Sequence, residues 1–312
     1  MRLLIALILL TLSINVTKAE EGPIDSLELA KKGFVITMDY ALAEPDTCYK
    51  LKLKGLSALT NFDHPELLGA LSKLQHLDLV ENNLTSLPDA IGELKNLQIL
   101  DIRMNNIREL PEWITGLSHL QYIEAQYNNI TSLPDGMENM VSLKNLILSD
   151  NNIRYAKTLE PVCNIKNLKA LVVNDNKLDD LPDCLGELDS LYAFSAYGNE
   201  IENIPEGLLG LESVVVMNLG KNKLKTLPKD FSKLQTIERL YLSENGMKEV
   251  PECIFNMPYL EKLDLSENEL KFIPEKIRNL RNLKELQIWD NNLSQENIKQ
   301  LKEWLPNTDI VD

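Results

Sequence analysis

The chain has 312 residues, 44% of them apolar, which is ample for a large continuous core. It carries 47 acidic against 32 basic residues, a formal net charge of −15. This balance argues against nucleic acid and against an anionic membrane surface as partners, and it favours solubility.

The first 19 residues have the pattern of a secretory signal peptide. Arg2 gives a basic start, residues 3–12 are apolar apart from Thr11, and Thr17 and Ala19 are small residues at positions −3 and −1 of a cleavage site. The apolar run is shorter than the roughly 20 residues that span a bilayer. We therefore expect cleavage after Ala19, no membrane insertion of the mature chain, and a secreted, periplasmic or cell-surface location. The alternative is an apolar N-terminal helix packed on the fold of an intracellular protein.

The stretch over residues 20–73 differs from the chain that follows. Asp25 or Ser26 can cap a short helix, residues 34–43 fit a second helix, and residues 48–53 alternate as a strand does. A repeat array without an end piece would expose its apolar interior. We interpret this stretch as an N-terminal helical cap with a degenerate first repeat.

Residues 74–293 form a tandem repeat. In the repeat that starts at Leu97, apolar residues fall at Leu97, Leu100, Ile102, Ile107, Leu110, Ile114 and Leu117. This spacing fits neither a helix nor a long alternating strand. It predicts one turn of a coil in which a short strand, a corner and a convex segment all send apolar side chains to one interior. About ten such turns make a solenoid.

Each repeat also carries an asparagine among its core positions. The step is 23 residues, except for 25 residues between repeats four and five, and the positions are Asn82, Asn105, Asn128, Asn151, Asn176, Asn199, Asn222, Asn245, Asn268 and Asn291. A buried amide needs hydrogen-bond partners, so we expect a ladder of Asn side chains bonded to the backbone of the corners. Corner dipeptides such as Leu87-Pro88 then start the convex segment, where proline suits the first helical position.

The repeat Leu-x-x-Leu-x-Leu-x-x-Asn-x-Leu-x-x-Leu-Pro-x-x-Ile-Gly-x-Leu-x-x is intact in residues 74–96 and resembles the leucine-rich repeat family. Its 23-residue length and Leu-Pro corner are similar to those of secreted bacterial members and of Ras-pathway scaffold proteins. The resemblance implies an α/β fold, a right-handed solenoid shaped like a horseshoe with a concave parallel β-sheet. Bacterial members of this kind are exported, and some contact host or envelope proteins.

Repeat four departs from the pattern. Tyr155-Ala156-Lys157 stands where Leu-Pro is expected, and two extra residues follow. This is either tolerated drift on a surface loop or a functional bulge. Cys163 and Cys184 lie near each other in register, which is compatible with a disulfide and equally with two buried free thiols.

Residues 294–312 predict a C-terminal cap. Ser294 starts a helix that has Leu301 on its apolar side and is stopped by Pro306, and residues 309–311 can add a last strand. This end resembles the C-terminal caps of secreted bacterial members of the family.

Sequence motifs for chemistry are absent. The three histidines, His64, His76 and His119, fall in different coils away from cysteine, and no metal-ligand or phosphate-loop spacing occurs. The acidic residues that precede the ladder Asn could bind Ca²⁺ in a row, but Met104, Tyr127, Gly198 and Lys221 interrupt them, so a solvated edge is the better interpretation. We expect no catalytic residue, no cofactor and no metal site.

The strand side chains that face away from the core occupy the third, fifth and seventh places of each repeat. They predict a central apolar field with Tyr anchors and a polar rim, typical of a protein interface, although strands favour β-branched and aromatic residues in any case. The predicted partner-binding residues on this concave face are Ile99, Arg103, Tyr122, Gln126, Ile147, Val172, Tyr197, Val216 and Tyr241. We expect a monomer that binds a protein or peptide of unknown identity without catalysis. The alternatives are an intracellular scaffold or regulatory subunit for a signalling enzyme, if residues 1–19 are no signal peptide, and an enzyme, if a polar pocket lies in the arc.

Overall fold

The computed structural model describes residues 29, 32–33, 35, 38–54 and 70–312. They fall into two compact units that divide after Asn151. The expected signal peptide, the helix caps Asp25 and Ser26, and His64 lie outside the described residues.

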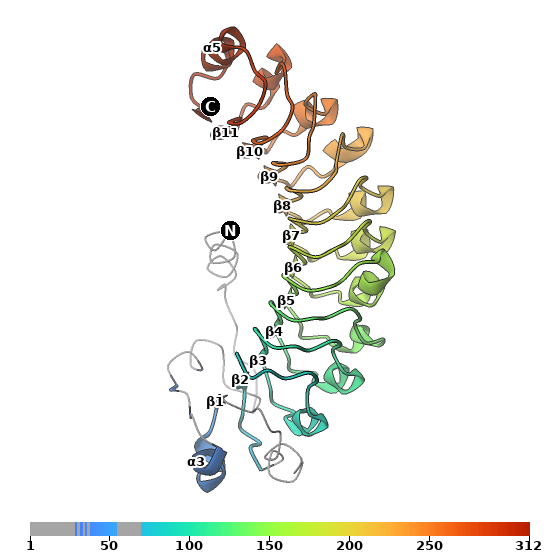
Figure 1. The fold of residues 1–312 in the computed structure, drawn as a ribbon, viewed down its shortest axis with the longest axis vertical. Coiled ribbons are helices and arrows are strands. Elements are labelled where there is room, and N and C mark those ends of the chain that lie inside the picture. Colours follow the sequence, from blue (N-terminus) through green and yellow to red (C-terminus); the bar gives the residue numbers. More distant parts are fainter. Residues whose placement is uncertain (1–28, 30–31, 34, 36–37, 55–69) are drawn as a thin grey trace. The chain divides into compact units, whose positions relative to one another are not determined.

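The first unit contains a parallel sheet whose strands lie side by side in chain order (Figure 1). Its strands are β1 (Lys50–Lys52), β2 (His76–Asp78), β3 (Ile99–Asp101), β4 (Tyr122–Glu124) and β5 (Asn145–Ile147). Val35 pairs with Leu51 of β1 and exchanges backbone hydrogen bonds of 2.8 Å with Lys50 and Lys52. The helix expected over residues 34–43 is therefore shorter, α3 (Met38–Ala43), because Val35 is part of the sheet edge.

The second unit continues the same plan of parallel strands in chain order. Its strands are β6 (Ala170–Val172), β7 (Ala193–Ser195), β8 (Val216–Asn218), β9 (Arg239–Tyr241), β10 (Lys262–Asp264), β11 (Glu285–Gln287) and β12 (Asp309–Val311). Helix α5 (Gln295–Trp304) precedes β12, and the Ser294 hydroxyl caps it by accepting a hydrogen bond from the Asn297 N–H at 3.1 Å. The helix and the last strand expected after Ser294 are both confirmed.

Short 3-10 helices lie on the side of each coil opposite the strands (Figure 1). They are η1 (Pro45–Thr47), η2 (Asp89–Glu93), η3 (Glu112–Gly116), η4 (Met137–Asn139), η5 (Ala156–Asn164), η6 (Asp183–Glu187), η7 (Glu206–Gly210), η8 (Lys229–Lys233), η9 (Glu252–Asn256) and η10 (Glu275–Asn279). The corner proline stands one place earlier than expected: Pro88 is the N-cap of η2, in extended conformation, not its first helical residue. The α/β solenoid with a parallel sheet is confirmed.

The core is a column of apolar side chains between the strands and the 3-10 helices. Leu77 and Leu79 of the second coil are fully buried, as strand alternation predicts. The ladder Asn side chains close this column at the corner. Asn222, for example, donates to the carbonyl oxygens of Ala196 (2.9 Å) and Leu219 (3.1 Å), and its Oδ1 accepts from the Ile201 N–H at 3.0 Å. Each such Asn ties its own coil to the one before it.

The residue before each ladder Asn has a left-handed backbone. Its φ lies between 49° and 69° in all ten repeats, at Glu81, Met104, Tyr127, Asp150, Asp175, Gly198, Lys221, Glu244, Glu267 and Asp290. This conformation turns the chain out of the strand so that the Asn can point inward. Glycine adopts this conformation most readily, yet Gly198 is the only glycine among these ten residues.

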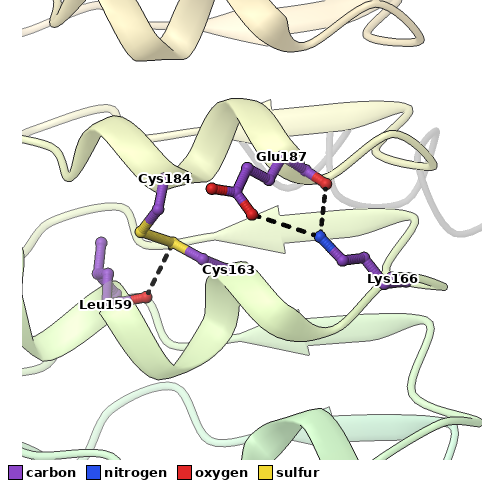
Figure 2. Close-up of a disulfide and its surroundings, with 5 residues drawn as sticks. All are labelled: Leu159, Cys163, Lys166, Cys184 and Glu187. Carbon is purple, nitrogen blue, oxygen red and sulfur yellow. Dashed lines mark hydrogen bonds and ion pairs between the residues drawn. A yellow bond between two sulfur atoms is a disulfide. The ribbon is translucent and has the colours of Figure 1, made fainter.

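Repeat four is joined to its neighbour by a disulfide. The nine-residue η5, which contains the two extra residues, ends beside η6, and Cys163 bonds to Cys184 with a Cα–Cα distance of 5.6 Å (Figure 2). Lys166 reinforces the junction through an ion pair of 3.5 Å with the Glu187 carboxylate. Of the two arrangements that the sequence left open for these cysteines, the structure has the bridge.

Removing this disulfide should lower the free energy of unfolding by about 3 kcal/mol, because the bridge closes a chain segment with a sequence separation of 21 residues. Chemical denaturation of wild type with and without a thiol reductant measures the loss. The Cys163→Ser/Cys184→Ser variant is the control, since reductant should not affect it: the other cysteines, Cys48 and Cys253, are free and buried. A reductant effect of equal size on this variant would contradict the assignment.

Helices η6 and η7 pack with their backbones in contact. A Cβ atom built on Gly186 would lie 1.8 Å from the carbonyl oxygen of Gly207, and one on Gly210 would lie 2.7 Å from the carbonyl oxygen of Gly186. The coils can approach this closely only because glycine has no side chain.

Candidate functional site

The side chains that the strands direct away from the core form what we call the open face of each unit. The predicted partner-binding residues all lie there, in two groups. Ile99, Arg103, Tyr122, Gln126 and Ile147 belong to the first unit, and Val172, Tyr197, Val216 and Tyr241 to the second.

Burial divides these residues in a way that the sequence does not indicate. Ile147, Val172 and Val216 are only 2%, 1% and 4% exposed, and Gln126 is 7% exposed. Strands lie about 4.8 Å apart, so side chains on the open face cover one another. The apolar members Ile147, Val172 and Val216 are therefore buried within their own open faces, whereas Ile99, Arg103, Tyr122, Tyr197 and Tyr241 are partly exposed.

Arg103 is the centre of a charge network on the first open face. Its guanidinium donates two hydrogen bonds to Asp101, at 2.8 and 2.5 Å, and its Nε lies 3.2 Å from the Glu124 carboxylate. The hydrogen bond to Asp101 raises the pKa of Arg103, with a further contribution from Glu124. On the neighbouring strands, Lys52 of β1 pairs with Asp78 of β2. These charges are thus balanced mainly within the face.

Burial shifts the titration of two neighbours of this network. It lowers the pKa of His76 to about 4, assisted by the positive charge of Lys50, so the imidazole is neutral at pH 7. Burial also raises the pKa of Glu124, against the opposing effect of Arg103. His76 has Asp78 and Asp101 nearby, but among the described parts of the chain no three His, Cys, Asp or Glu side chains gather closely enough to hold a metal ion.

Tyr197 dominates the open face of the second unit. It reaches past the next coil, where a Cβ on Gly220 would lie 3.1 Å from its ring, and its hydroxyl donates to Glu244 Oε1 at 2.6 Å. Burial and this hydrogen bond raise the pKa of the phenol. The Lys221 ammonium lies 5.7 Å from the ring centroid. The ring is therefore held in a fixed place with one face partly exposed.

Tyr241 has a comparable setting two strands further on. Lys262 Nζ lies 5.6 Å from its ring centroid and forms an ion pair of 2.6 Å with Glu285. Burial raises the pKa of Tyr241. The contacts of Glu244 with Tyr197 and of Lys262 with Tyr241 could not be predicted from the sequence. The repeat pattern does not indicate which side chain reaches across one or two coils.

Comparison with known families settles the kind of protein. A profile described as "Leucine-rich repeat region" matches residues 36–174, and one described as "Leucine rich repeat" matches residues 237–293, together more than half of the chain. The chain belongs to the leucine-rich repeat family. No curated protein matches its sequence.

Solved leucine-rich repeat structures share the fold. An internalin from Listeria monocytogenes is 21% identical with a TM-score of 0.65, over 92% of this chain and 88% of the internalin. The leucine-rich repeat ectodomain of the Arabidopsis thaliana receptor kinase GASSHO1/SCHENGEN3, in complex with Casparian strip integrity factor 2, is 22% identical with a TM-score of 0.53. That match covers 86% of this chain and 39% of the ectodomain. A leucine-rich repeat protein from Leptospira interrogans is 23% identical with a TM-score of 0.44, over 90% of this chain and all of that one.

At these identities the internalin and the receptor ectodomain establish the leucine-rich repeat fold and nothing finer. In the portion of the chain that the structure describes, no helix is both long enough and apolar enough to cross a membrane. Among the predicted partner-binding residues, Ile99, Arg103, Tyr122, Tyr197 and Tyr241 remain partly exposed on the two open faces.

Proposed function

We propose that this protein is exported and binds a protein or peptide partner through its open faces, without catalysing a reaction. The observation that carries the proposal is the set of partly exposed side chains there: Ile99, Arg103 and Tyr122 in the first unit, and Tyr197 and Tyr241 in the second. Tyr and Arg are the residues that most often anchor protein interfaces. The internalin and the receptor ectodomain, which is in complex with Casparian strip integrity factor 2, support a binding role by their fold.

The mechanism we propose is rigid display. Tyr197 is fixed by Glu244, and Arg103 by Asp101 and Glu124, so these side chains lose little conformational freedom when a partner binds. The buried Ile147, Val172 and Val216 hold the face in shape beneath them. Within this proposal the partner is neither nucleic acid nor membrane, and the protein acts as a monomer.

Tyr122→Ala and Tyr197→Ala should each weaken binding of the partner by about 2 kcal/mol or more, the size typical of an interface anchor. The partner is first isolated with the mature protein as bait, and the affinities of purified variants are then measured. Tyr259→Ala is the matched control, because Tyr259 is exposed but precedes β10 and lies off the open face. Equal affinity of all three variants would place the binding site elsewhere.

The proposed export rests on residues 1–19 and is supported by the Cys163–Cys184 disulfide, since such bonds persist mainly in oxidising compartments. Mass spectrometry of the mature protein should find Glu20 at its N-terminus; a chain still starting at Met1 would favour the intracellular scaffold.

From the sequence pattern we also propose a division of the chain into a signal peptide (1–19), an N-terminal cap (20–73), ten repeats (74–293) and a C-terminal cap (294–312).

A further inference from the structure

Buried polar atoms without a hydrogen-bond partner lie along two neighbouring strands and the residues that follow them, on the open face of the first unit. Over the described residues there are five such atoms, and four of them are Gln126 Oε1, Asn145 Oδ1, Asn145 Nδ2 and Ser149 Oγ. These three side chains, which we call the amide cluster, are 7%, 1% and 4% exposed. The fifth atom, Trp113 Nε1, belongs to η3.

The amide cluster has a defined geometry. Strand β5 is in register with β4, with Asn145 opposite Tyr122 and Ile147 opposite Glu124. Two residues further on, the same register places Ser149 beside Gln126, and the Tyr127 N–H donates to the Ser149 carbonyl oxygen at 3.1 Å. Asn145 and Ser149 are four residues apart on one extended chain, about 13 Å.

Elsewhere the open face satisfies equivalent groups. Ser266 occupies the same place in its repeat as Ser149, and its hydroxyl donates to Asp264 Oδ1 at 2.6 Å. The Ser195 hydroxyl likewise donates to Asn174 Oδ1 at 2.6 Å. Native proteins rarely leave buried polar groups unpaired, and the exceptions call for a specific explanation. The amide cluster is such an exception.

We propose that the amide cluster binds an uncharged, extended peptide segment through its main chain. This inference rests on the proposed function and specifies its ligand. A carboxamide presents a donor and an acceptor side by side, which complements the N–H and C=O groups of a peptide backbone. Asn145 holds both groups unpaired, and Gln126 and Ser149 add an acceptor and a hydroxyl. The 13 Å span corresponds to about four residues of extended peptide.

The surroundings select against a charged ligand. The amide cluster contains no charged side chain, and the nearest part of the charge network, Arg103 with Asp101 and Glu124, is already paired. Tyr122 is partly exposed and pairs with Asn145 in the register of β4 and β5, so its side chain can move when the peptide binds, a rearrangement common at interfaces.

Stability measurements on the free protein provide the first test. Asn145→Leu keeps the number and branching of the side-chain heavy atoms and removes both unpaired groups, and Ser149→Ala removes the unpaired hydroxyl, so both should leave Tm unchanged or raise it. Ser266→Ala, the matched control, breaks a formed hydrogen bond and should lower Tm. If Asn145→Leu lowers Tm as much as Ser266→Ala does, its amide is satisfied in solution and the proposal is wrong.

Peptide selection provides the second test. A displayed library of random linear peptides is selected on wild-type protein, and the selected peptides are synthesised. Asn145→Leu should weaken their binding about tenfold or more. Methylating single backbone nitrogens in the bound segment should cause a similar loss, whereas exchanging its side chains among uncharged residues should not. Peptides whose affinity is unaffected by both Asn145→Leu and backbone methylation would overturn the proposal, as would a selection that yields no binder.

The outcomes separate this inference from the proposed function. Peptides that bind independently of Asn145 but lose affinity on Tyr197→Ala would leave the open face as the binding site and remove the amide cluster from it. A glycan array run in parallel covers the other ligand class that hydroxyl and amide groups recognise. Binding of glycans without any peptide would overturn both.

Discussion

Asn105→Ala is expected to lower the free energy of unfolding of the first unit by at least about 1–3 kcal/mol, the cost of stranding a buried polar partner. The Asn105 amide donates to the carbonyl oxygens of Leu79 and Ile102, both at 2.9 Å. Its oxygen accepts from the N–H groups of Asn82 (3.0 Å) and Leu84 (2.9 Å). Alanine would leave these buried groups unpaired in two adjacent coils. Urea denaturation followed by circular dichroism measures the change.

Asn106→Ala is the matched control, because Asn106 is the next residue and its side chain is exposed. It should change stability by less than about 0.5 kcal/mol. Asn105→Asp tests the direction of the bonds, since a carboxylate accepts but cannot donate to the two carbonyl oxygens. If Asn105→Asp is as stable as wild type, the amide does not hold the coils together as described.

Gly186→Ala should lower the free energy of unfolding by a similar amount, roughly 3 kcal/mol, which is the upper part of the range for overpacking. The new methyl group would lie 1.8 Å from the carbonyl oxygen of Gly207. That oxygen belongs to the backbone of η7, so no side-chain rotation relieves the clash and the two 3-10 helices must separate. The disulfide at Cys184 limits how far η6 can move.

Gly92→Ala controls for the general cost of losing glycine. Gly92 occupies the same place in its repeat as Gly186, but a Cβ there would meet only the Trp113 side chain at 3.5 Å, an ordinary contact. Thermal unfolding should show a small shift for Gly92→Ala and a large one for Gly186→Ala. Equal shifts would mean that the close approach of η6 and η7 does not decide stability.

The repeat pattern predicts the coil because each place carries a fixed physical demand. Leu77 and Leu79 alternate inward on a strand, and Asn105 can be buried only where backbone groups turn to meet it. These demands are local and recur in every coil, so ten copies reinforce one another. The strands and the C-terminal helix after Ser294 follow directly from such signals.

The open face is harder to predict, because its exposure depends on neighbours in other coils. Ile99 and Ile147 are both outward-facing isoleucines, yet Ile99 is partly exposed and Ile147 is buried, so residue type and place in the strand do not decide exposure. The bond from Tyr197 to Glu244 spans 47 residues and depends on the absence of a side chain at Gly220. Such contacts between particular side chains leave no periodic trace in the sequence.

The left-handed residue before each ladder Asn has a practical consequence. Nine of these ten residues are not glycine, and a left-handed backbone costs such a residue of order 1–3 kcal/mol. Glycine would instead cost about 0.4–1 kcal/mol through the greater freedom of its unfolded chain. Replacing such a residue with glycine should therefore stabilise the protein against heat. Met104→Gly, which copies the residue at Gly198, would do so without altering the core or the open face.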